Sequence, residues 1–456
     1  MITTTNPADG TTIAEYARHD DGEVEARLAR SWTRFTHDWR TRPLDDRTDL
    51  LERLADVLDD RTDELARLMT AEMGKPIRAA RSEVEKCAWL CRHYAETAET
   101  YLAGRSIQTD AAKSYVRYDP MGPILAVMPW NFPLWQVFRF LVPNVVGGNT
   151  CLLRHASNVT GTALEIERMV AEAGGPDGLF TTLLCDHDTV ESIIGDRRVR
   201  GVTLTGSDVA GRAVAAAAGR NLKPSVMELG GSDPFIVLDD ADLDLAAQLA
   251  VDSRYLNSGQ SCINAKRLIV AESRYEDFLD ALVQRVKGLV VGDPTEESTD
   301  IGPLASEGHR DTVADQVHRT LVHRNGGEAL VGATMIDGPG AFYAPTVIRD
   351  VNPEAPAASE EVFGPVSAVM SAADDDVAVA LANATRFGLG AAIITGDDER
   401  GEAVAAQIDA GMVFVNQLVK SDPRLPFGGV KDSGYGRELS QEGAVAFLNT
   451  KLVWVD

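Results

Sequence analysis

The chain is poor in cysteine, and this scarcity excludes several classes of site. Its 456 residues contain five cysteines, at Cys87, Cys91, Cys151, Cys185 and Cys262. An odd number at wide spacing does not form the paired framework of a disulfide-stapled secreted domain. Cys87 and Cys91 share one face of a predicted helix, but the nearby His93 does not complete a four-ligand zinc pattern. We therefore expect both to be packing residues, and we expect no metal site.

Lysine is also scarce, and basic residues as a whole are outnumbered. Only nine of the 44 basic residues are lysine, against 69 acidic residues, which gives a net charge of −25. A chain this acidic is not expected to bind nucleic acid or an anionic membrane surface. The excess of Asp and Glu suits a protein from a high-salt cytoplasm, although a simply acidic protein has the same composition.

Long apolar runs are absent. A stretch such as "GPILAVM" (122–128) is too short to span a bilayer and is typical of a buried strand. The N-terminal residues lack the basic flank and apolar core of a signal peptide. We expect a cytoplasmic protein of enzyme size, with two or three domains and no internal repeat.

The periodicity of the apolar residues changes along the chain. The first hundred residues space them three and four apart, as helices do, whereas strand-like and helix-like segments alternate from residue 114 onward. A second alternating series runs from about residue 243 to residue 415. Alternation with buried strands predicts parallel sheets covered by helices on both faces. The C-terminal segment from Ala444 is predicted to be an edge strand given to a neighbouring subunit.

One strand–helix junction has the features of a phosphate site. In "VTLTGSDVAG" a buried strand ends at Thr205, Gly206 makes the turn, and Ser207 can cap the next helix, whose first amides attract anions. The usual G-x-G-x-x-G fingerprint is absent, so an ordinary capped helix explains this segment as well.

Two further motifs present polar groups at strand ends. Prolines on both sides of Asn131 in "PWNFP" fix its amide, as a donor to a developing oxyanion requires, although a turn asparagine has the same surroundings. Glu228 in "MELGGSDP" precedes two glycines and could accept a proton, although a salt-bridged surface glutamate is the simpler alternative.

Cys262 stands out from the other cysteines. It follows the small polar residues of "NSGQSC" rather than apolar ones, which favours an accessible thiol. The run "SCINA" suits a helix start, which would lower its pKa. A thiol, a carboxylate, a fixed amide and a phosphate site together suit one reaction. In that reaction a thiolate attacks an aldehyde, a hydride leaves to a nicotinamide, and water hydrolyses the thioester.

With these motifs, the chain resembles the aldehyde dehydrogenase family over essentially its whole length. The motifs "PWNFP", "TGSDVAG", "ELGG", "GQSC", "EEVFGPV" and "PFGGVKDSGYGRE" occur in the family's order. The resemblance implies Cys262 as nucleophile, Glu228 as the base that activates water, and Asn131 with the Cys262 amide as the oxyanion hole. The cofactor-binding residues that it implies are Pro129, Trp130, Arg154, Ser157, Gly206, Ser207, Leu229, Glu361 and Phe363.

The resemblance also implies an α/β architecture. It predicts two Rossmann-type parallel-sheet domains and a small β arm for oligomerisation. The cofactor domain comprises 1–103 and 120–230, the catalytic domain 231–432, and the arm 104–119 and 433–456. We expect a homodimer or homotetramer.

Within the family, the chain is most similar to the short prokaryotic succinate-semialdehyde dehydrogenases. That substrate carries a carboxylate at its far end, so its site needs a cation. Arg139 matches a position where similar enzymes place a carboxylate-binding arginine. Some relatives carry a second arginine where this chain has Leu256, and we expect Ser421 or Arg424 to replace it.

The cofactor is expected to be NADP, with NAD usable. Similar enzymes place a lysine where this chain has Arg154, whose planar fork fits a phosphate. Relatives that prefer NAD often carry a glutamate where this chain has the neutral Ser157. Three other functions stay open: oxidation of an uncharged aliphatic aldehyde, a thiol-dependent esterase, and a non-catalytic binding protein.

Overall fold

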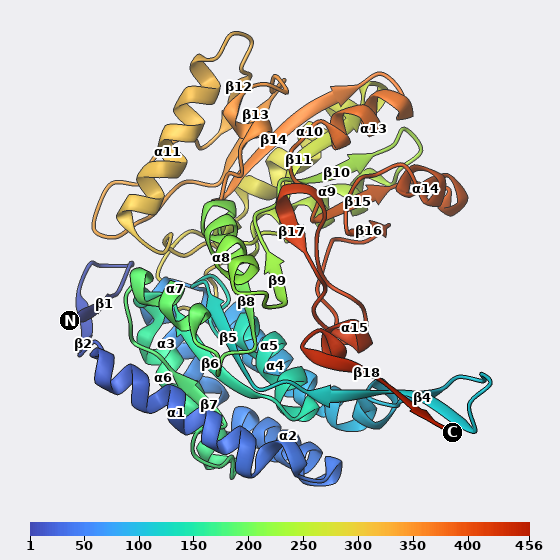
Figure 1. Ribbon diagram of the computed structural model, residues 1–456. Helices are drawn as coiled ribbons and strands as arrows, with labels where there is room; N and C mark the ends of the chain where they lie inside the picture. Colours follow the sequence, from blue (N-terminus) through green and yellow to red (C-terminus); the bar gives the residue numbers. More distant parts are fainter.

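The computed structural model describes all of residues 1–456, which form two α/β lobes and a projecting arm (Figure 1). The lower lobe in that view is built on a six-stranded sheet and the upper lobe on a seven-stranded sheet. None of the helices combines the length and the apolar character needed to cross a membrane.

The six-stranded sheet has the order β17-β9-β8-β5-β6-β7 and is parallel except for the short edge strand β17. Its strands are β5 (Pro123–Met128), β6 (Thr150–His155), β7 (Phe180–Thr182), β8 (Gly201–Thr205), β9 (Ser225–Glu228) and β17 (Gly434–Tyr435). The parallel strands are largely buried on both faces, and the central strand β5 reads as a continuous apolar run.

Helices cover this sheet on both sides because successive strand residues point to opposite faces. Ile124 and Ala126 pack into the core formed with α2 to α6, whereas Leu125 packs into the core formed with α1, α7 and α8. The helices are α1 (Asp21–His37), α2 (Leu44–Asp60), α3 (Thr62–Met73), α4 (Ile77–Tyr101), α5 (Trp135–Gly147), α6 (Thr160–Glu172), α7 (His187–Gly195) and α8 (Asp208–Arg220).

The seven-stranded sheet has the order β12-β13-β14-β11-β10-β15-β16, with only the edge strand β12 antiparallel. Its strands are β10 (Asp233–Val237), β11 (Ala265–Ala271), β12 (Glu328–Val331), β13 (Thr346–Arg349), β14 (Val366–Ala372), β15 (Gly390–Ile394) and β16 (Met412–Val415). Around it lie α9 (Leu243–Arg254), α10 (Tyr275–Lys287), α11 (Glu307–Val322), α12 (Pro356–Ser359), α13 (Asp375–Asn383) and α14 (Asp398–Ala405).

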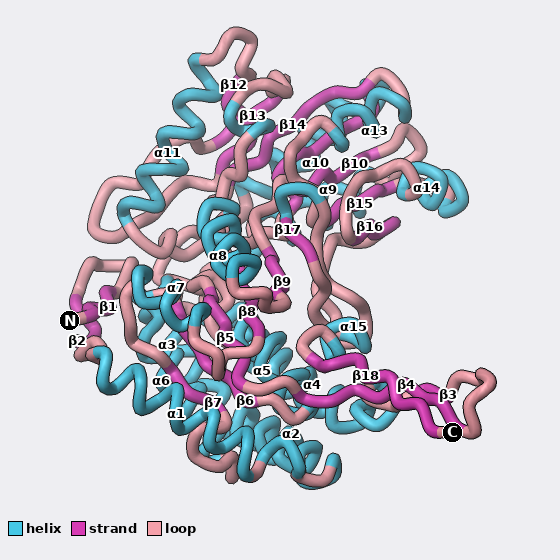
Figure 2. The backbone as a smooth tube through the Cα atoms, in the orientation of Figure 1, coloured by secondary structure: helices cyan, strands magenta, loops and turns pink.

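The arm is a three-stranded antiparallel sheet that projects from the lower lobe (Figure 2). It consists of β3 (Arg105–Ser106), β4 (Lys113–Pro120) and β18 (Leu448–Val455), and β18 follows the short helix α15 (Ser440–Val445). Strand β18 pairs along its length with β4, from Leu448 opposite Pro120 to Val455 opposite Lys113. Its other edge is free, and it exposes 63% of Leu452 and 46% of Trp454.

The structure differs from the sequence-based expectation in three places. An N-terminal hairpin, β1 (Ile2–Thr5) and β2 (Thr12–Tyr16), precedes the first helix in a region where mostly helix was expected. The C-terminal strand was expected to be an edge strand given to a neighbouring subunit, with no sheet nearby in sequence, and within the chain it pairs with the distant β4. Strand β17, within the predicted arm segment 433–456, instead joins the six-stranded sheet beside β9. The pairings of β18 with β4 and of β17 with β9 join distant segments, which local periodicity does not encode.

Candidate active site

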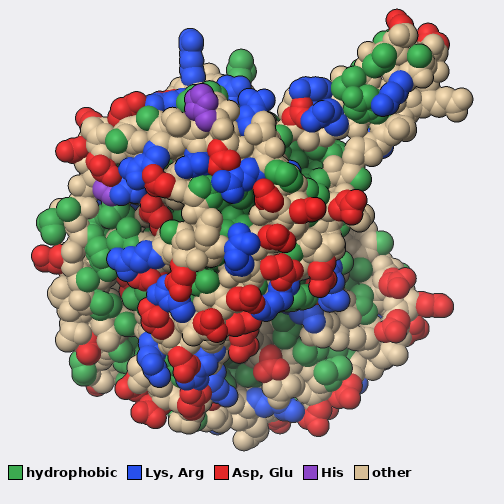
Figure 3. Space-filling model, turned by 90° about the horizontal axis from the view of Figure 1, so that it is seen from below, with side chains coloured by type: hydrophobic (Ala, Val, Ile, Leu, Met, Phe, Trp, Pro, Cys, Tyr) green, Lys and Arg blue, Asp and Glu red, His purple; other side chains and the backbone are tan.

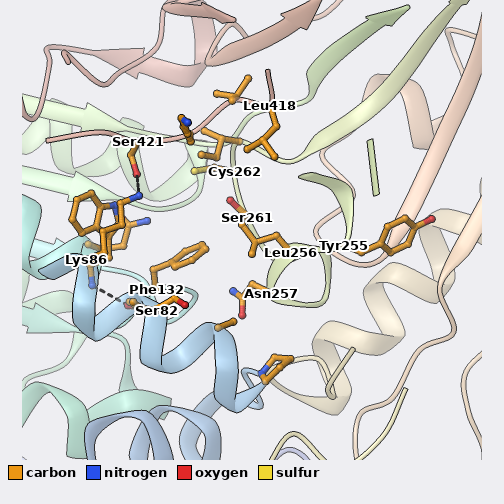
Figure 4. Close-up of a pocket in the computed structure, with 18 of the residues that line it drawn as sticks. Ser82, Lys86, Phe132, Tyr255, Leu256, Asn257, Ser261, Cys262, Leu418 and Ser421 are labelled. Atoms are coloured by element: carbon orange, nitrogen blue, oxygen red, sulfur yellow. Dashed lines mark hydrogen bonds between the residues drawn. The ribbon is translucent and has the colours of Figure 1, made fainter. Parts of the chain in front are cut away.

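A cavity of about 410 Å³ lies between the two lobes, and Cys262 is on its wall. It is lined by residues of α4 and α5, by the loop before β11, and by residues 418–421 after β16. Figure 4 shows Cys262, Phe132 and Ser421 around the same space. The cavity therefore brings together segments that are more than a hundred residues apart in sequence.

An unusual backbone turn presents Cys262 to this cavity. Asn257, Ser258 and Gly259 all have left-handed φ angles, of 54°, 56° and 77°. For the two residues with side chains this conformation is costly and persists only where the surroundings impose it. A Cβ atom at Gly259 would collide with the backbone of Gly364, so the glycine is needed for close approach.

Buried cations hold this turn in place. Arg254, fully buried, donates to the carbonyls of Gly259 (3.3 Å), Val362 (2.9 Å) and Gly364. It thereby ties the cysteine loop to the "EEVFGPV" segment. Lys266 Nζ donates to the carbonyl oxygens of Ser261 (2.8 Å) and Cys262 (2.7 Å). Both residues position the loop, and sequence reasoning missed both.

The local structure at Cys262 differs from the expectation. The residue lies in a turn between a short 3-10 helix (Leu256–Gly259) and β11, not at the start of an α-helix. Burial raises the pKa of its thiol to about 12, although the nearby charges of Lys266 and Arg139 oppose the shift. The predicted lowering by a helix start was therefore wrong.

Asn131 lies at the end of β5 and is held next to the cysteine loop. Its Nδ2 donates to the carbonyl of Gln260 at 3.2 Å, and its own carbonyl accepts from Asn257 Nδ2 at 2.8 Å. Its amide is therefore fixed, as the flanking prolines predicted. Its second amide hydrogen is not engaged by these bonds.

A buried carboxylate supports the segment that follows Asn131. Glu83 Oε1 accepts from the backbone N–H groups of Leu134 and Trp135, both at 2.9 Å, at the start of α5. The other oxygen of Glu83 forms a buried ion pair with Lys75, whose ammonium also lies 3.8 Å from the centre of the Phe132 ring. A buried charge is tolerated when it is paired and hydrogen-bonded in this way.

Glu228, at the end of β9, is buried beside a second carboxylate. Neither of its side-chain oxygens has a hydrogen-bond partner, and it is not among the residues that line the cavity. Its pKa is raised well above the usual range, first by burial and then by the charge of Glu438. A Cβ atom at Gly428 would approach Glu228 Oε1 to 2.6 Å, so this glycine leaves room for the carboxylate.

Two of the predicted cofactor-binding residues belong to an aromatic cluster. Trp130 and Phe363 meet edge to face with ring centres 5.8 Å apart, and His309 completes the group at 5.4 and 5.9 Å from them. Glu361 is held by Gly231 N at 3.1 Å and lies 3.5 Å from Lys266 Nζ. Pro129 immediately precedes this cluster, and His309 was not predicted from the sequence.

The predicted pyrophosphate segment is a capped helix. Ser207 accepts from Ala210 N at 3.3 Å at the start of α8, and Gly206 donates to the carbonyl of Glu228 at 3.0 Å. Leu229 packs against Gly211 on this helix, where a Cβ atom would collide with it. The helix start therefore has the polarity that attracts a phosphate.

Arg154 and Ser157 line a separate small cavity of about 80 Å³. Arg154 Nη2 lies 3.3 Å from His187 Nε2, and the charge of Arg154 is the main cause that lowers the pKa of His187. Arg18, paired with Asp186, lines the same cavity. The charge of Arg154 would attract an anion that enters this cavity.

The predicted substrate residues are only partly brought together. Arg139 and Ser421 line the cavity, whereas Arg424 does not. Arg424 has 65% of its side chain exposed and pairs with Asp422 at 2.7 Å. Arg139 lies 2.8 Å from Glu438 in a buried ion pair, so its charge is already compensated.

The structure adds a cation that sequence reasoning missed. Lys86, on α4, lines the cavity and donates to Ser421 Oγ at 2.8 Å, a bond drawn as a dashed line in Figure 4. Its position near the middle of a long helix carries no sequence signal, because a surface lysine of a helix has the same pattern. Leu256, which stands where some relatives carry a second arginine, also lines the cavity and is 42% exposed.

Comparison with known proteins places these features in one family. A model of the aldehyde dehydrogenase family matches residues 1–453. The chain is 49% identical over its whole length to succinate-semialdehyde dehydrogenase [NADP(+)] 1 of Mycobacterium tuberculosis, of which it covers 99%. It is 47% identical to the succinate-semialdehyde dehydrogenase [NADP(+)] of Mycobacterium avium, covering 100% of this chain and 96% of that protein.

The fold agrees with solved structures. The crystal structure of succinic semialdehyde dehydrogenase from Streptococcus pyogenes in complex with NADP+ superposes with a TM-score of 0.97 at 38% identity, over 100% of both chains. The two lobes and the thiol-lined cavity therefore define an oxidoreductase. The chain belongs to the aldehyde dehydrogenase family. The predicted family and the two-sheet α/β fold are confirmed.

Proposed function

We propose that the protein oxidises succinate semialdehyde to succinate with NADP as the preferred oxidant. The observation that supports this proposal most directly is the composition of the cavity wall. Cys262 shares a cavity of about 410 Å³ with the cationic side chains of Lys86 and Arg139. A short aldehyde with a distal carboxylate fits such a site, and the relatives named above carry this activity in their names.

In the proposed reaction Cys262 is the nucleophile. Its thiol gives up its proton to solvent, the thiolate sulfur bonds to the aldehyde carbon, and the resulting oxyanion accepts hydrogen bonds from Asn131 Nδ2 and from the backbone amide of Cys262. The cofactor-binding residues would hold NADP, which would supply the acceptor for the hydride that leaves this carbon as the oxyanion returns to a carbonyl. The carbon is then a thioester on Cys262. Water attacks it, the carbon–sulfur bond breaks, and succinate leaves.

Glu228 is proposed as the base that accepts a proton from the attacking water. Its pKa is raised, with burial as the main cause, so its buried position favours the neutral carboxyl over the carboxylate. It must therefore lose its proton and move toward the cavity before it acts, and its lack of hydrogen-bond partners leaves it free to do so.

The cofactor residues fit a phosphorylated dinucleotide. The cavity beside β6 presents Arg154 and the exposed Ser157, with no glutamate to repel a 2′-phosphate. We assign the capped start of α8 at Gly206 and Ser207 to the pyrophosphate, with Leu229 beside it. Glu361, Phe363, Trp130 and Pro129 are assigned to the nicotinamide ribose and ring. NAD lacks the 2′-phosphate and remains usable.

The domain division and the assembly state are part of the proposal. We assign 1–103 and 120–230 to cofactor binding, 231–432 to catalysis, and 104–119 with 433–456 to the arm, apart from β17, which pairs with β9 of the six-stranded sheet. The free edge of β18, with exposed Leu452 and Trp454, supports a homodimer or homotetramer built through this arm. We place the enzyme in the cytoplasm.

A substrate panel tests the proposal. Purified enzyme is assayed for kcat/KM with succinate semialdehyde and with butanal, an uncharged aldehyde of the same carbon number, using NADP and NAD in turn. We expect the highest value for succinate semialdehyde with NADP. Equal or higher values for butanal would contradict the substrate. Ester hydrolysis that needs no nucleotide, without aldehyde oxidation, would favour an esterase instead.

A further inference from the structure

Four cationic side chains line the cavity that contains Cys262, and they differ in what already neutralises them. They are Arg78, Lys86, Arg139 and Lys420. Arg78 is largely exposed and pairs with Asp300 at 2.7 Å. Arg139 pairs with Glu438 at 2.8 Å and lies 4.3 Å from the centre of the Phe427 ring. Lys420 is exposed to solvent. Lys86 is the one that is partly buried and forms no ion pair.

The ammonium of Lys86 is held in position but has N–H groups that are not used by its protein contacts. It donates to Ser421 Oγ at 2.8 Å and lies 4.4 Å from the centre of the Trp135 ring, a cation–π contact. An ammonium has three donors, so the bond to Ser421 leaves two for a ligand. The hydroxyl of Ser421 can itself donate to the same ligand.

The carboxylates near Lys86 are committed to other partners. Glu83, one turn earlier on α4, pairs with Lys75 and accepts from the start of α5. Asp422, beside Ser421, pairs with Arg424 at 2.7 Å. The remaining charged neighbour is Arg139, which repels the ammonium. Lys86 therefore lies in a half-buried, partly apolar site in which no carboxylate of the protein pairs with its ammonium. An anionic ligand would supply the counter-charge.

We propose that Lys86, together with the hydroxyl of Ser421, binds the distal carboxylate of a short ω-carboxy aldehyde whose carbonyl is attacked by Cys262. This inference rests on the proposed function and names the residue that decides its substrate class. Arg139 then serves mainly to neutralise Glu438, and it contributes a more distant positive charge to the same ligand. Leu256 and Phe132 supply the apolar surface for the methylene groups.

The charge state of Lys86 makes the preference depend on pH. Its pKa is lowered to about 8, first by burial and then by Arg139, while Cys87, Asp422 and Glu83 act in the opposite direction. An ammonium group is charged below its pKa and neutral above it. The preference of the free enzyme for succinate semialdehyde over butanal should therefore be full below about pH 8 and decline above it.

The test compares Lys86→Met with Lys86→Arg in the full-length enzyme. Met keeps the length of the side chain without its charge, and Arg keeps the charge at every pH used. For Lys86→Met we expect kcat/KM with succinate semialdehyde to fall by about 10- to 100-fold, the scale of one charged hydrogen bond. Butanal oxidation should change by less than about threefold, which also shows that the variant folds. Lys287→Met, an exposed lysine on α10, is the matched control for the loss of one charge.

The Arg variant gives a second readout that a structural role would not produce. Lys86→Arg should keep the preference for succinate semialdehyde and lose its decline above about pH 8. An equal loss with both aldehydes in Lys86→Met, or no loss with either, would overturn the proposal. A selective loss in Lys420→Met but not in Lys86→Met would move the carboxylate to the rim and would also overturn it. If the wild-type enzyme does not prefer succinate semialdehyde over butanal, the proposed function itself fails, and this outcome is seen before any variant is made.

Discussion

Arg139 and Glu438 form a buried ion pair beside the cavity, with Arg139 Nη2 2.8 Å from Glu438 Oε2. The side chains are only 2% and 7% exposed, and their contact is not aligned as a hydrogen bond. The pair connects α5, which follows Asn131, to the C-terminal segment that packs beside Glu228. A residue that the sequence suggested as a free substrate ligand is therefore also part of the structural core.

Removing one member of this pair should destabilise the protein. Arg139→Met leaves Glu438 buried without a counter-ion, and the expected cost is roughly 3–5 kcal/mol of unfolding free energy. Arg139→Met with Glu438→Leu removes both charges and should recover a large part of this loss. Denaturant unfolding of both variants measures the difference. Equal stability of the single variant and the wild type would show that the pair contributes little.

Glu438 should also set the pH dependence of the base. Its charge raises the pKa of Glu228, after burial, so Glu438→Gln should lower that pKa. A base works only when deprotonated, so activity declines as pH falls through the pKa of Glu228. In Glu438→Gln this acidic limb of the kcat profile should therefore move to lower pH. A shift to higher pH would contradict the coupling of the two carboxylates.

The thiol of Cys262 should react slowly at neutral pH in the free enzyme. Its pKa is raised to about 12, mainly by burial, so little thiolate exists near pH 7. The rate of alkylation of Cys262 by iodoacetamide, followed by mass spectrometry, should rise steadily with pH up to at least pH 9. A plateau already below pH 7 would indicate a low-pKa thiolate.

The variant Cys262→Ala should lose turnover while still binding NADP.

The cofactor preference should reverse through one residue. Ser157→Glu places a carboxylate in the small cavity with Arg154, where it repels a 2′-phosphate and can accept from ribose hydroxyls. We expect kcat/KM with NADP to fall by about 10- to 100-fold, with little change for NAD. Ser157→Gln, of similar size and neutral, is the control. An equal loss with both cofactors would show a steric effect only.

The acidic surface predicts a response to salt. Figure 3 shows acidic side chains spread over the face seen from below, with basic ones among them. A net charge of −25 repels itself, and salt screens that repulsion. The Tm should therefore rise between low and molar potassium chloride. A constant or falling Tm would mean that the surface ion pairs, which salt weakens, contribute as much as the repulsion costs.

Much of the architecture could be predicted because it depends on local patterns. The segments that form β5, β6 and β8 were predicted as strands, and Gly206 with Ser207 marks the start of α8 as expected. The order of the motifs identified the family and, within it, the positions of Cys262, Glu228 and Asn131. Residue type and spacing decide such features, because they act over a few neighbouring residues.

Other features were decided only by the tertiary structure. The pKa of Cys262 follows from burial and from Lys266, not from its position in the sequence. The availability of Arg139 depends on Glu438, which lies about 300 residues away in the chain. In the sequence Lys86 has the pattern of an ordinary helix lysine. Only in the folded chain do α4, α5 and Ser421 enclose it in one cavity. The sequence determined which chemical groups the protein possesses. Packing decided which of these groups are paired and which remain free for a ligand, because charge compensation and desolvation act between residues that meet only in the folded chain.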